Sequence, residues 1–274
     1  MAMVTMDEVI KKLDELAPRD LALEGDVIGL QVSSRAFGRL SNVRVRGVGV
    51  IVYPTYLAVS KCLEKGANLI ISHHPLPLHL VARYGVQPFA YRTLALLLSN
   101  KAYLFVLHSN WLSAESGISE SLSEVLNFEV IGTLNVRCGT RNIPIGRICR
   151  FERSCNLRFL AQYISHRLGD VDIYYTGMQD EDVGKIGVVG GCIPGHEFLI
   201  KAYNSGVDTI VTGEYRYEDA VLASELGLKL IAVGRYESER PGMVRLSQIL
   251  QLEFPSIKVF FVDERVPRFH VRVS

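Results

Sequence analysis

The sequence predicts an α/β protein, and a short internal similarity suggests that it consists of two related α/β lobes. Strand-like apolar runs alternate with helical segments, which is typical of βαβ units and a largely parallel sheet. The 274 residues are enough for one large domain or two small ones. Segments 62–75 and 202–215 also look alike, each passing from a helix end through Gly into an apolar strand with a polar end. This likeness suggests a duplication, although any βαβ protein can produce it by chance.

The first half of the chain predicts one helix followed by alternating strands and helices. Four apolar residues at helical spacing predict an amphipathic helix over 6–16. The run 43–53 alternates and then turns apolar, as in a strand that enters a buried sheet. Pro54 suits the first turn of the next helix, and Gly66 ends it. We then expect a strand at 67–72, a helix at 89–100, a strand at 102–107, a loop, and a helix at 117–126.

The middle of the chain changes character before the alternation resumes. Residues 136–153 hold short β-like runs with Gly and Pro, and 156–168 has the spacing of an amphipathic helix. The remaining predicted strands are 171–176, 185–190, 207–212, 229–234 and 257–262, and the remaining predicted helices are 195–205, 215–226 and 241–252.

Composition excludes several classes of protein. The chain carries 30 basic and 29 acidic side chains, so a general nucleic-acid or acidic-lipid binder is not expected. Its apolar fraction of 48% excludes a disordered chain. The run 66–82 has no formal charge but contains three His and two Pro, which makes it a poor membrane span. Five widely spaced Cys, no CxxC and no signal-peptide pattern predict a reduced, cytoplasmic protein without a membrane contact.

The sharpest chemical feature is the sequence Ser72-His73-His74-Pro75 at the end of a predicted buried strand. Ligands of open α/β sheets bind at the carboxyl ends of strands, and imidazole suits Zn, Fe, Cu or Ni. Neighbouring side chains of an extended segment point to opposite sides, so the two His could serve two ions, or one ion across a bent loop. The alternative is two hydrogen-bonded His at a strand–loop junction.

Other strand ends carry polar clusters of the same kind. His108-Ser109-Asn110 follows the strand at 102–107 and either lines the same cleft or forms a turn. Carboxylates at 212–214 and 234–239 either bind metal and act as acid–base groups or cap the helices that follow.

Two further segments could bind phosphate. The Gly-rich turn 190–195 joins a strand to a helix, so it is either a phosphate cradle or a tight turn. Residues 137–167 contain seven Arg and one Glu, and this excess fits either nucleotide or nucleic-acid contacts or a solvated face with oligomer contacts.

Five segments in order along the chain look like the motifs of one known family. They are GDVIGLQ (25–31), IISHHPLPL (70–78), HSNWLSAESGISESLSEVL (108–126), TGEYRYEDA (212–220) and GRYESE (234–239). With them the sequence resembles the Nif-three-like family, often called GTP cyclohydrolase type 2 homologs, over nearly its whole length. The resemblance implies two α/β lobes that face a cleft with a two-metal site, and assembly as a toroidal hexamer.

The resemblance also implies which residues hold metal. His73, His74 and Glu239 match the family's ligands. Four positions depart from its motifs: Gly25 replaces a Trp, Leu112 an Asp, Glu218 a His and Arg235 a His. Leu cannot ligate a metal and Arg is a cation, so we expect one divalent ion (Zn, Fe or Mn) on the three retained ligands rather than two ions. A site without metal, with Arg235 paired to Glu239 or holding an anion, is the alternative.

The sequence therefore leaves two functional hypotheses. The first is a metal-dependent hydrolase of the GTP cyclohydrolase type that acts on a nucleotide or phosphorylated metabolite. The second is a non-catalytic, ring-forming protein that binds a protein, a nucleotide or nucleic acid. In either case the cleft is expected to include His108, Asn110, Glu214, Glu218 and Arg235. The family resemblance implies that the first lobe spans 1–128 and 232–274, and the second lobe 129–231.

Overall fold

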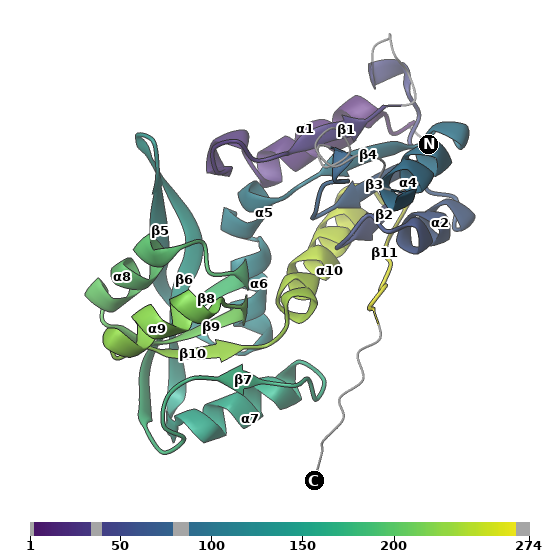
Figure 1. Cartoon of the computed structure of the whole chain (residues 1–274). Coiled ribbons are helices and arrows are strands. Elements are labelled where there is room, and N and C mark those ends of the chain that lie inside the picture. Colours follow the sequence, from purple (N-terminus) through teal and green to yellow (C-terminus); the bar gives the residue numbers. More distant parts are fainter. Residues whose placement is uncertain (1–2, 34–39, 79–87, 267–274) are drawn as a thin grey trace.

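The computed structural model describes residues 3–33, 40–78 and 88–266 and contains two separate β-sheets (Figure 1). The five-stranded sheet has the order β1-β4-β3-β2-β11, and the six-stranded sheet has the order β5-β6-β8-β9-β10-β7. The two-lobed α/β prediction is confirmed. Within the described residues no helix combines the length and the apolar character that crossing a bilayer requires.

The five-stranded sheet is buried on both faces. It consists of β1 (Gly29–Val32), β2 (Gly47–Ile51), β3 (Leu69–Ser72), β4 (Tyr103–Val106) and β11 (Lys258–Phe261). Its neighbours run parallel except β1, which is antiparallel to β4. Val48 and Val50 pack in one cluster with residues of α1 (Met6–Leu16) and α10 (Arg235–Glu253), whereas Ile70 packs in another with α2 (Tyr56–Glu64) and α4 (Pro88–Ser99). This alternation explains why its strands read as apolar runs.

The six-stranded sheet mixes directions. It consists of β5 (Glu129–Cys138), β6 (Arg141–Asn156), β7 (Tyr174–Tyr175), β8 (Asp182–Cys192), β9 (Val207–Glu214) and β10 (Lys229–Ala232). Strands β8, β9 and β10 are parallel, and the other pairs are antiparallel. One face packs against α8 (His196–Asn204) and α9 (Tyr217–Glu225), and the other against α6 (Ile118–Val125) and α7 (Leu157–Arg167).

Three helices connect the sheets. The chain leaves β4 through α5 (Ser109–Ser113) and α6, and it returns from β10 through α10 to β11 (Figure 1). Helices α6 and α10 approach closely: a Cβ on Gly242 would lie 2.7 Å from the Cα of Ile118. Leu112, on α5, packs against the hydrophobic clusters of both sheets.

Most of the predicted elements are present within a few residues of their expected bounds. The helix at 6–16 is confirmed, with a capping box between Thr5 and Glu8. Thr55 caps α2 through its side chain. The strand expected at 171–176 is reduced to the two residues of β7, and β1 was not predicted.

Three predictions of local structure were wrong. The short runs expected at 136–153 are two long strands, β5 and β6, which form a hairpin because their side chains pack across it on both faces. A short helix, α5, occupies the loop expected after His108, since Asn110 bonds to two backbone groups there. The helix expected at 241–252 begins at Arg235, and Pro241 lies inside it. The hydrogen bond lost at this proline is offset by the buried face that includes Met243 and Leu246.

Candidate metal centre at the end of the first sheet

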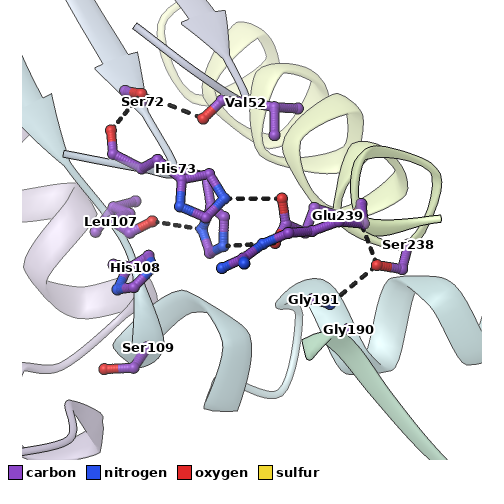
Figure 2. A network of polar contacts seen from close by, with 12 residues as sticks. Val52, Ser72, His73, Leu107, His108, Ser109, Gly190, Gly191, Ser238 and Glu239 are labelled. Atoms are coloured by element: carbon purple, nitrogen blue, oxygen red, sulfur yellow. Dashed lines mark hydrogen bonds and ion pairs between the residues drawn. The ribbon is translucent and has the colours of Figure 1, made fainter. Parts of the chain in front are cut away.

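His73 and His74 lie immediately after β3, where the chain bends, and Figure 2 shows His73 beside Glu239. Their backbone N–H groups donate to the carbonyl oxygens of Ile51 and Val52 on the neighbouring strand. The Ser72 hydroxyl donates to the carbonyl of His74 over 2.7 Å. The two rings lie 4.6 Å apart and both reach the same carboxylate, so they converge across a bend instead of pointing to opposite sides. This geometry favours one ion over two.

A third imidazole joins the pair from the next strand. His108 follows β4, which is parallel to β3, and its ring lies 4.9 Å from that of His73. One nitrogen atom from each of His73, His74 and His108 lies within 4.8 Å of the other two. We call these three residues the histidine cluster. It is a candidate metal site made of nitrogen ligands.

Hydrogen bonds behind the rings fix two of the imidazoles. The Nδ1 atom of His73 lies 2.9 Å from the carbonyl oxygen of Leu107, which can only accept, so Nδ1 carries the proton. The Nδ1 atom of His108 lies 2.7 Å from a carboxylate oxygen of Asp26. In the neutral ring of His73 the lone pair is then on Nε2. Metal-binding His is oriented in this way by a carbonyl or carboxylate on its other nitrogen.

Asp26 is itself held by several donors. Its second oxygen accepts from the backbone N–H of Ser109 over 2.9 Å and from the Ser109 hydroxyl. Burial works against ionisation of Asp26, but the hydrogen bonds from His108 and Ser109 outweigh this effect, so the pKa of Asp26 is lowered. Asp26 was not predicted as a site residue. It lies within the segment 25–31 that carries the family resemblance, so the signal was present.

Glu239 closes the histidine cluster from helix α10. Its side chain is 1% exposed, and one of its oxygens lies 2.9 Å from Nε2 of His74. The other oxygen lies 3.8 Å from Nε2 of His73 and 3.2 Å from Nε of Arg235. Because Arg235 and Glu239 are four residues apart on α10, they share one face of the helix. The predicted pairing of Arg235 with Glu239 is present.

Burial sets the protonation of these groups. It lowers the pKa of His73 well below its usual value, helped by His74. Burial, then His108 and Arg235, lower the pKa of His74 to about 2. The imidazoles are therefore neutral at pH 7, which is the form that binds metal. Burial also raises the pKa of Glu239, against the opposing effect of His73 and Arg235.

The charges around the histidine cluster favour a cation. Arg235 is engaged by two carboxylates, since its Nη1 lies 2.9 Å from Glu214 as well. With Asp26, three carboxyl groups lie around one guanidinium and the imidazoles. Carboxyl groups and imidazole nitrogens are groups that attract and ligate a cation. The alternative in which Arg235 binds an anion without metal is therefore disfavoured by its own partners.

Leu112 stands where the family resemblance implies a metal-ligating Asp, and its side chain cannot ligate a metal. It packs into both hydrophobic clusters, where it helps join the lobes. A carboxylate at this position would be surrounded by apolar neighbours.

The other predicted cleft residues lie at three different positions. Asn110 is buried and structural, because its side chain accepts from the backbone of His108 and donates to the carbonyl of Ala17. Glu214 lies at the end of β9 with its side chain half-exposed and bonds Arg235. Glu218 is exposed in the first turn of α9.

Packing accounts for the Gly-rich turn. A Cβ on Gly190 would lie 2.3 Å from Ile118, and one on Gly191 would lie 2.9 Å from a carboxylate oxygen of Glu239. The N–H of Gly191 donates to the hydroxyl of Ser238 over 2.9 Å (Figure 2). Of the two hypotheses for this turn, the tight turn is the one that the structure supports.

A cavity of about 410 Å³ opens beside the histidine cluster. Its wall includes His74, His108 and Arg235 together with Tyr53, and three prolines complete the lining. The Tyr53 ring stacks on His74 with centroids 4.0 Å apart. Tyr53 was not predicted as a site residue, because an aromatic residue at the end of a strand is ordinary in a core.

The seven Arg of segment 137–167 do not form one surface. Arg147 is buried, pairs with Glu120 and donates to the carbonyls of Ser113 and Ala114. Arg150 forms an exposed pair with Glu129 instead. At Arg147 both the phosphate-binding and the solvated-face hypotheses were wrong, since its charge is satisfied inside the protein.

Two α/β lobes with a histidine cluster at the strand ends of the first define a Nif-three-like class of protein. The family model for Duf34/NIF3 (NGG1p interacting factor 3) matches residues 4–267, and the chain belongs to this family. A "GTP cyclohydrolase 1 type 2 homolog" of Clostridium perfringens is 25% identical over 94% of this chain and 96% of its own. One of Methanocaldococcus jannaschii is 26% identical over 89% and 93%.

Solved structures share the fold. The Staphylococcus aureus protein SA1388 superposes with a TM-score of 0.82 at 21% identity, over 99% of this chain and 100% of that one. A Bacillus cereus protein related to NIF3 superposes with a TM-score of 0.81 at 20% identity, over 100% of both chains. At this identity the likeness concerns the fold alone.

Proposed function

We propose that the protein is a metal-dependent hydrolase with one divalent ion, acting on a nucleotide or phosphorylated metabolite. The observation that carries the proposal is the histidine cluster, in which three imidazoles converge next to the buried Glu239, with the carboxyl groups of Asp26 and Glu214 nearby. Of the predicted metals, zinc fits a nitrogen-rich donor set best. The predicted ligands His73, His74 and Glu239 stay in the proposal, and His108 joins them.

The residues around the ion have separate tasks. Leu107 and Asp26 hold His73 and His108 with Nε2 free of a proton. His74 shares a proton with Glu239, and this proton must leave Nε2 when an ion binds there. A divalent ion held by these residues would make a water molecule more acidic, towards a pKa of about 7, and so more reactive in hydrolysis. Tyr53 and the prolines shield the site from bulk water on one side.

The electrostatics make substrate binding depend on the ion. Without it, a phosphate would meet the carboxyl groups of Asp26, Glu214 and Glu239 close to a single guanidinium, that of Arg235. A divalent ion held there would offset that repulsion. An anionic substrate is therefore expected to bind the metal-loaded protein and not the metal-free one.

The alternative, a non-catalytic binding protein, is favoured by one observation. Arg235 already neutralises Glu239 and stands where the family has a metal-ligating His. If this pair persists, the cluster is a structural remnant and the protein acts through its surfaces. A homohexameric ring with a protein, nucleotide or nucleic-acid partner would then be its working form, with no membrane contact.

Metal content separates the two functions. The chain purified without a metal-affinity tag is expected to hold about one ion, or to regain it from Zn, Mn or Fe, by elemental analysis. The double variant His73→Ala/His74→Ala should hold none, and the control Glu218→Gln, on an exposed residue of α9, should match the wild type. Less than about a tenth of an ion per chain, unrestored by any of the three metals, rejects the metal site.

Turnover is tested on the loaded protein with panels of nucleotides and phosphorylated metabolites, followed by mass spectrometry. The expected result is a product that requires the metal and disappears in His73→Ala/His74→Ala. A stoichiometric ion without turnover of any compound supports the binding protein instead.

We keep the lobe boundaries 1–128 with 232–274, and 129–231, as a proposal. Strands β1 to β4 and β11 share one sheet, and β5 to β10 share the other, which supports this division. Oligomer size can be measured by light scattering, with six copies expected.

A further inference from the structure

A second cavity lies away from the histidine cluster, on the opposite side of the first turns of α10. It has a volume of about 360 Å³ and lies between α6, the end of α7 and α10. None of the histidine cluster, Asp26 or Glu239 lines it. Four guanidinium groups do: Arg167, Arg240, Arg245 and Arg265.

The pairing of these arginines leaves an excess of positive charge. Arg240 pairs with Asp263 at 2.9 Å, Arg265 with Glu237 at 3.5 Å, and Arg245 with Glu124. Arg167 donates instead to a neutral acceptor, the carbonyl oxygen of Val125. Four cations thus meet three carboxylates. This is the reverse of the histidine cluster, where carboxylates outnumber cations.

The geometry of two arginines suits a phosphate group. In the ion pairs of Arg240 and Arg265 the contact that the structure gives is made by Nε. The edge of a guanidinium that carries the two Nη groups is a planar fork that matches two oxygens of a phosphate. Their side chains are 42% and 48% exposed, so a ligand can reach them from solvent.

The rest of the wall suits the organic part of a ligand. Val125, Leu168 and Val244 contribute apolar surface, and Ser121 and Gln248 contribute groups that can donate or accept hydrogen bonds. The volume is at the lower end of the range for small-molecule sites, about 300–1,000 Å³. We propose that this cavity is a second ligand site, which binds a small organic phosphate.

Calorimetric titration of the full chain with ribose 5-phosphate tests the proposal. The experiment is run at low ionic strength with a chelator present, so that the histidine cluster holds no metal and its function does not enter. We expect one site per chain with a Kd below about 1 mM, and weaker binding of inorganic phosphate and of ribose. Affinity should fall as salt is added, because the contacts are ionic.

Variants locate the site. Arg240→Gln/Arg245→Gln should weaken binding at least tenfold, and Arg240→Lys/Arg245→Lys should lie in between, since it keeps the charges without the planar forks. Both residues pair with half-exposed carboxylates, so thermal unfolding should change little. Arg158→Gln, on an exposed residue of α7, is the matched control and should bind like the wild type.

Several outcomes would overturn the proposal. These are no heat from any probe up to several millimolar, equal loss in Arg158→Gln, or loss in Arg235→Gln with normal binding in Arg240→Gln/Arg245→Gln. Inorganic phosphate binding as tightly as ribose 5-phosphate would refute an organic ligand. If the double variant does not fold, Arg167→Gln takes its place, because Arg167 has no carboxylate partner among the described residues.

Discussion

The carboxyl ends of β3 and β9 occupy equivalent positions in the two lobes but carry different side chains. In both lobes a β-α-β-α-β unit sets a central strand between two parallel neighbours: β2-α2-β3-α4-β4 in one and β8-α8-β9-α9-β10 in the other. The end of β3 carries two buried His, and the end of β9 carries the half-exposed Glu214. The same topology thus places polar side chains at one edge of each sheet, but only those of the first lobe are buried and held in a fixed orientation.

Helix α10 explains the difference. It starts just after β10 of the second sheet and packs on the first, so Glu239 is carried over to the histidine cluster. The second lobe has no equivalent donor over β9 among the contacts described, and Glu214 turns to Arg235 of the same α10. A site with chemistry therefore needs the strand end of one lobe and a helix that begins in the other.

The largest expected effect concerns the link between the lobes. Arg147→Met should lower the free energy of unfolding by about 3–5 kcal/mol, because Glu120 and two helix-end carbonyls lose a buried partner. Chemical denaturation of Arg147→Met and of the exposed control Arg153→Met, on the same strand, measures it. A loss below about 1 kcal/mol would show that this contact does not hold the lobes together.

The next effect separates the two strand ends directly. Asp26→Asn should weaken metal binding about 10–100-fold. The amide no longer ensures that Nε2 of His108 carries the lone pair that binds the metal. Glu214→Gln, the control at the end of β9, should change the affinity less than about threefold. Equal losses in the two variants, measured by competition with a chromogenic chelator, would contradict the assignment of the site to the first lobe.

The pH dependence of stability tests the burial of the imidazoles. In the metal-free protein the pKa values of His73 and His74 lie below the 6.5 of the unfolded chain. As the pH falls below 6.5, the unfolded state binds protons that the folded state does not, so stability is lost on acidification. The slope should approach about 1.4 kcal/mol per pH unit for each His, less the opposing contribution of Glu239.

Urea unfolding between pH 7 and pH 5 measures this slope. His74→Asn should reduce it by about half. The control His166→Gln, on a residue with an 83% exposed side chain, should leave it unchanged. A flat profile for the wild-type chain would contradict the buried neutral cluster.

The smallest effect is expected at the exposed end of the Arg-rich segment. Arg150→Gln should change the free energy of unfolding by less than about 0.5 kcal/mol, because its pair with Glu129 is more than half exposed on both sides. The same denaturation series measures it. A loss comparable to that of Arg147→Met would mean that position along β6, and not burial, determines how much these arginines contribute to the free energy of unfolding.

Local patterns in the sequence predicted the strand–helix order, the two lobes and the polar strand ends. These follow from periodicity and turn signals, which need no distant partner. The pairing of Arg235 with Glu239 was one of the alternatives, since residues four apart on a helix face each other.

Which polar residues meet depends on the tertiary fold. Asp26 and His108 are separated by 82 residues, and His74 and Glu239 by 165, so their contacts depend on how the sheets and α10 pack. Burial then gave the same residue types opposite roles, as with Arg147 inside the protein and Arg150 at its surface. The sign of the charge around each cavity follows from these pairings and not from the near-zero net charge of the chain.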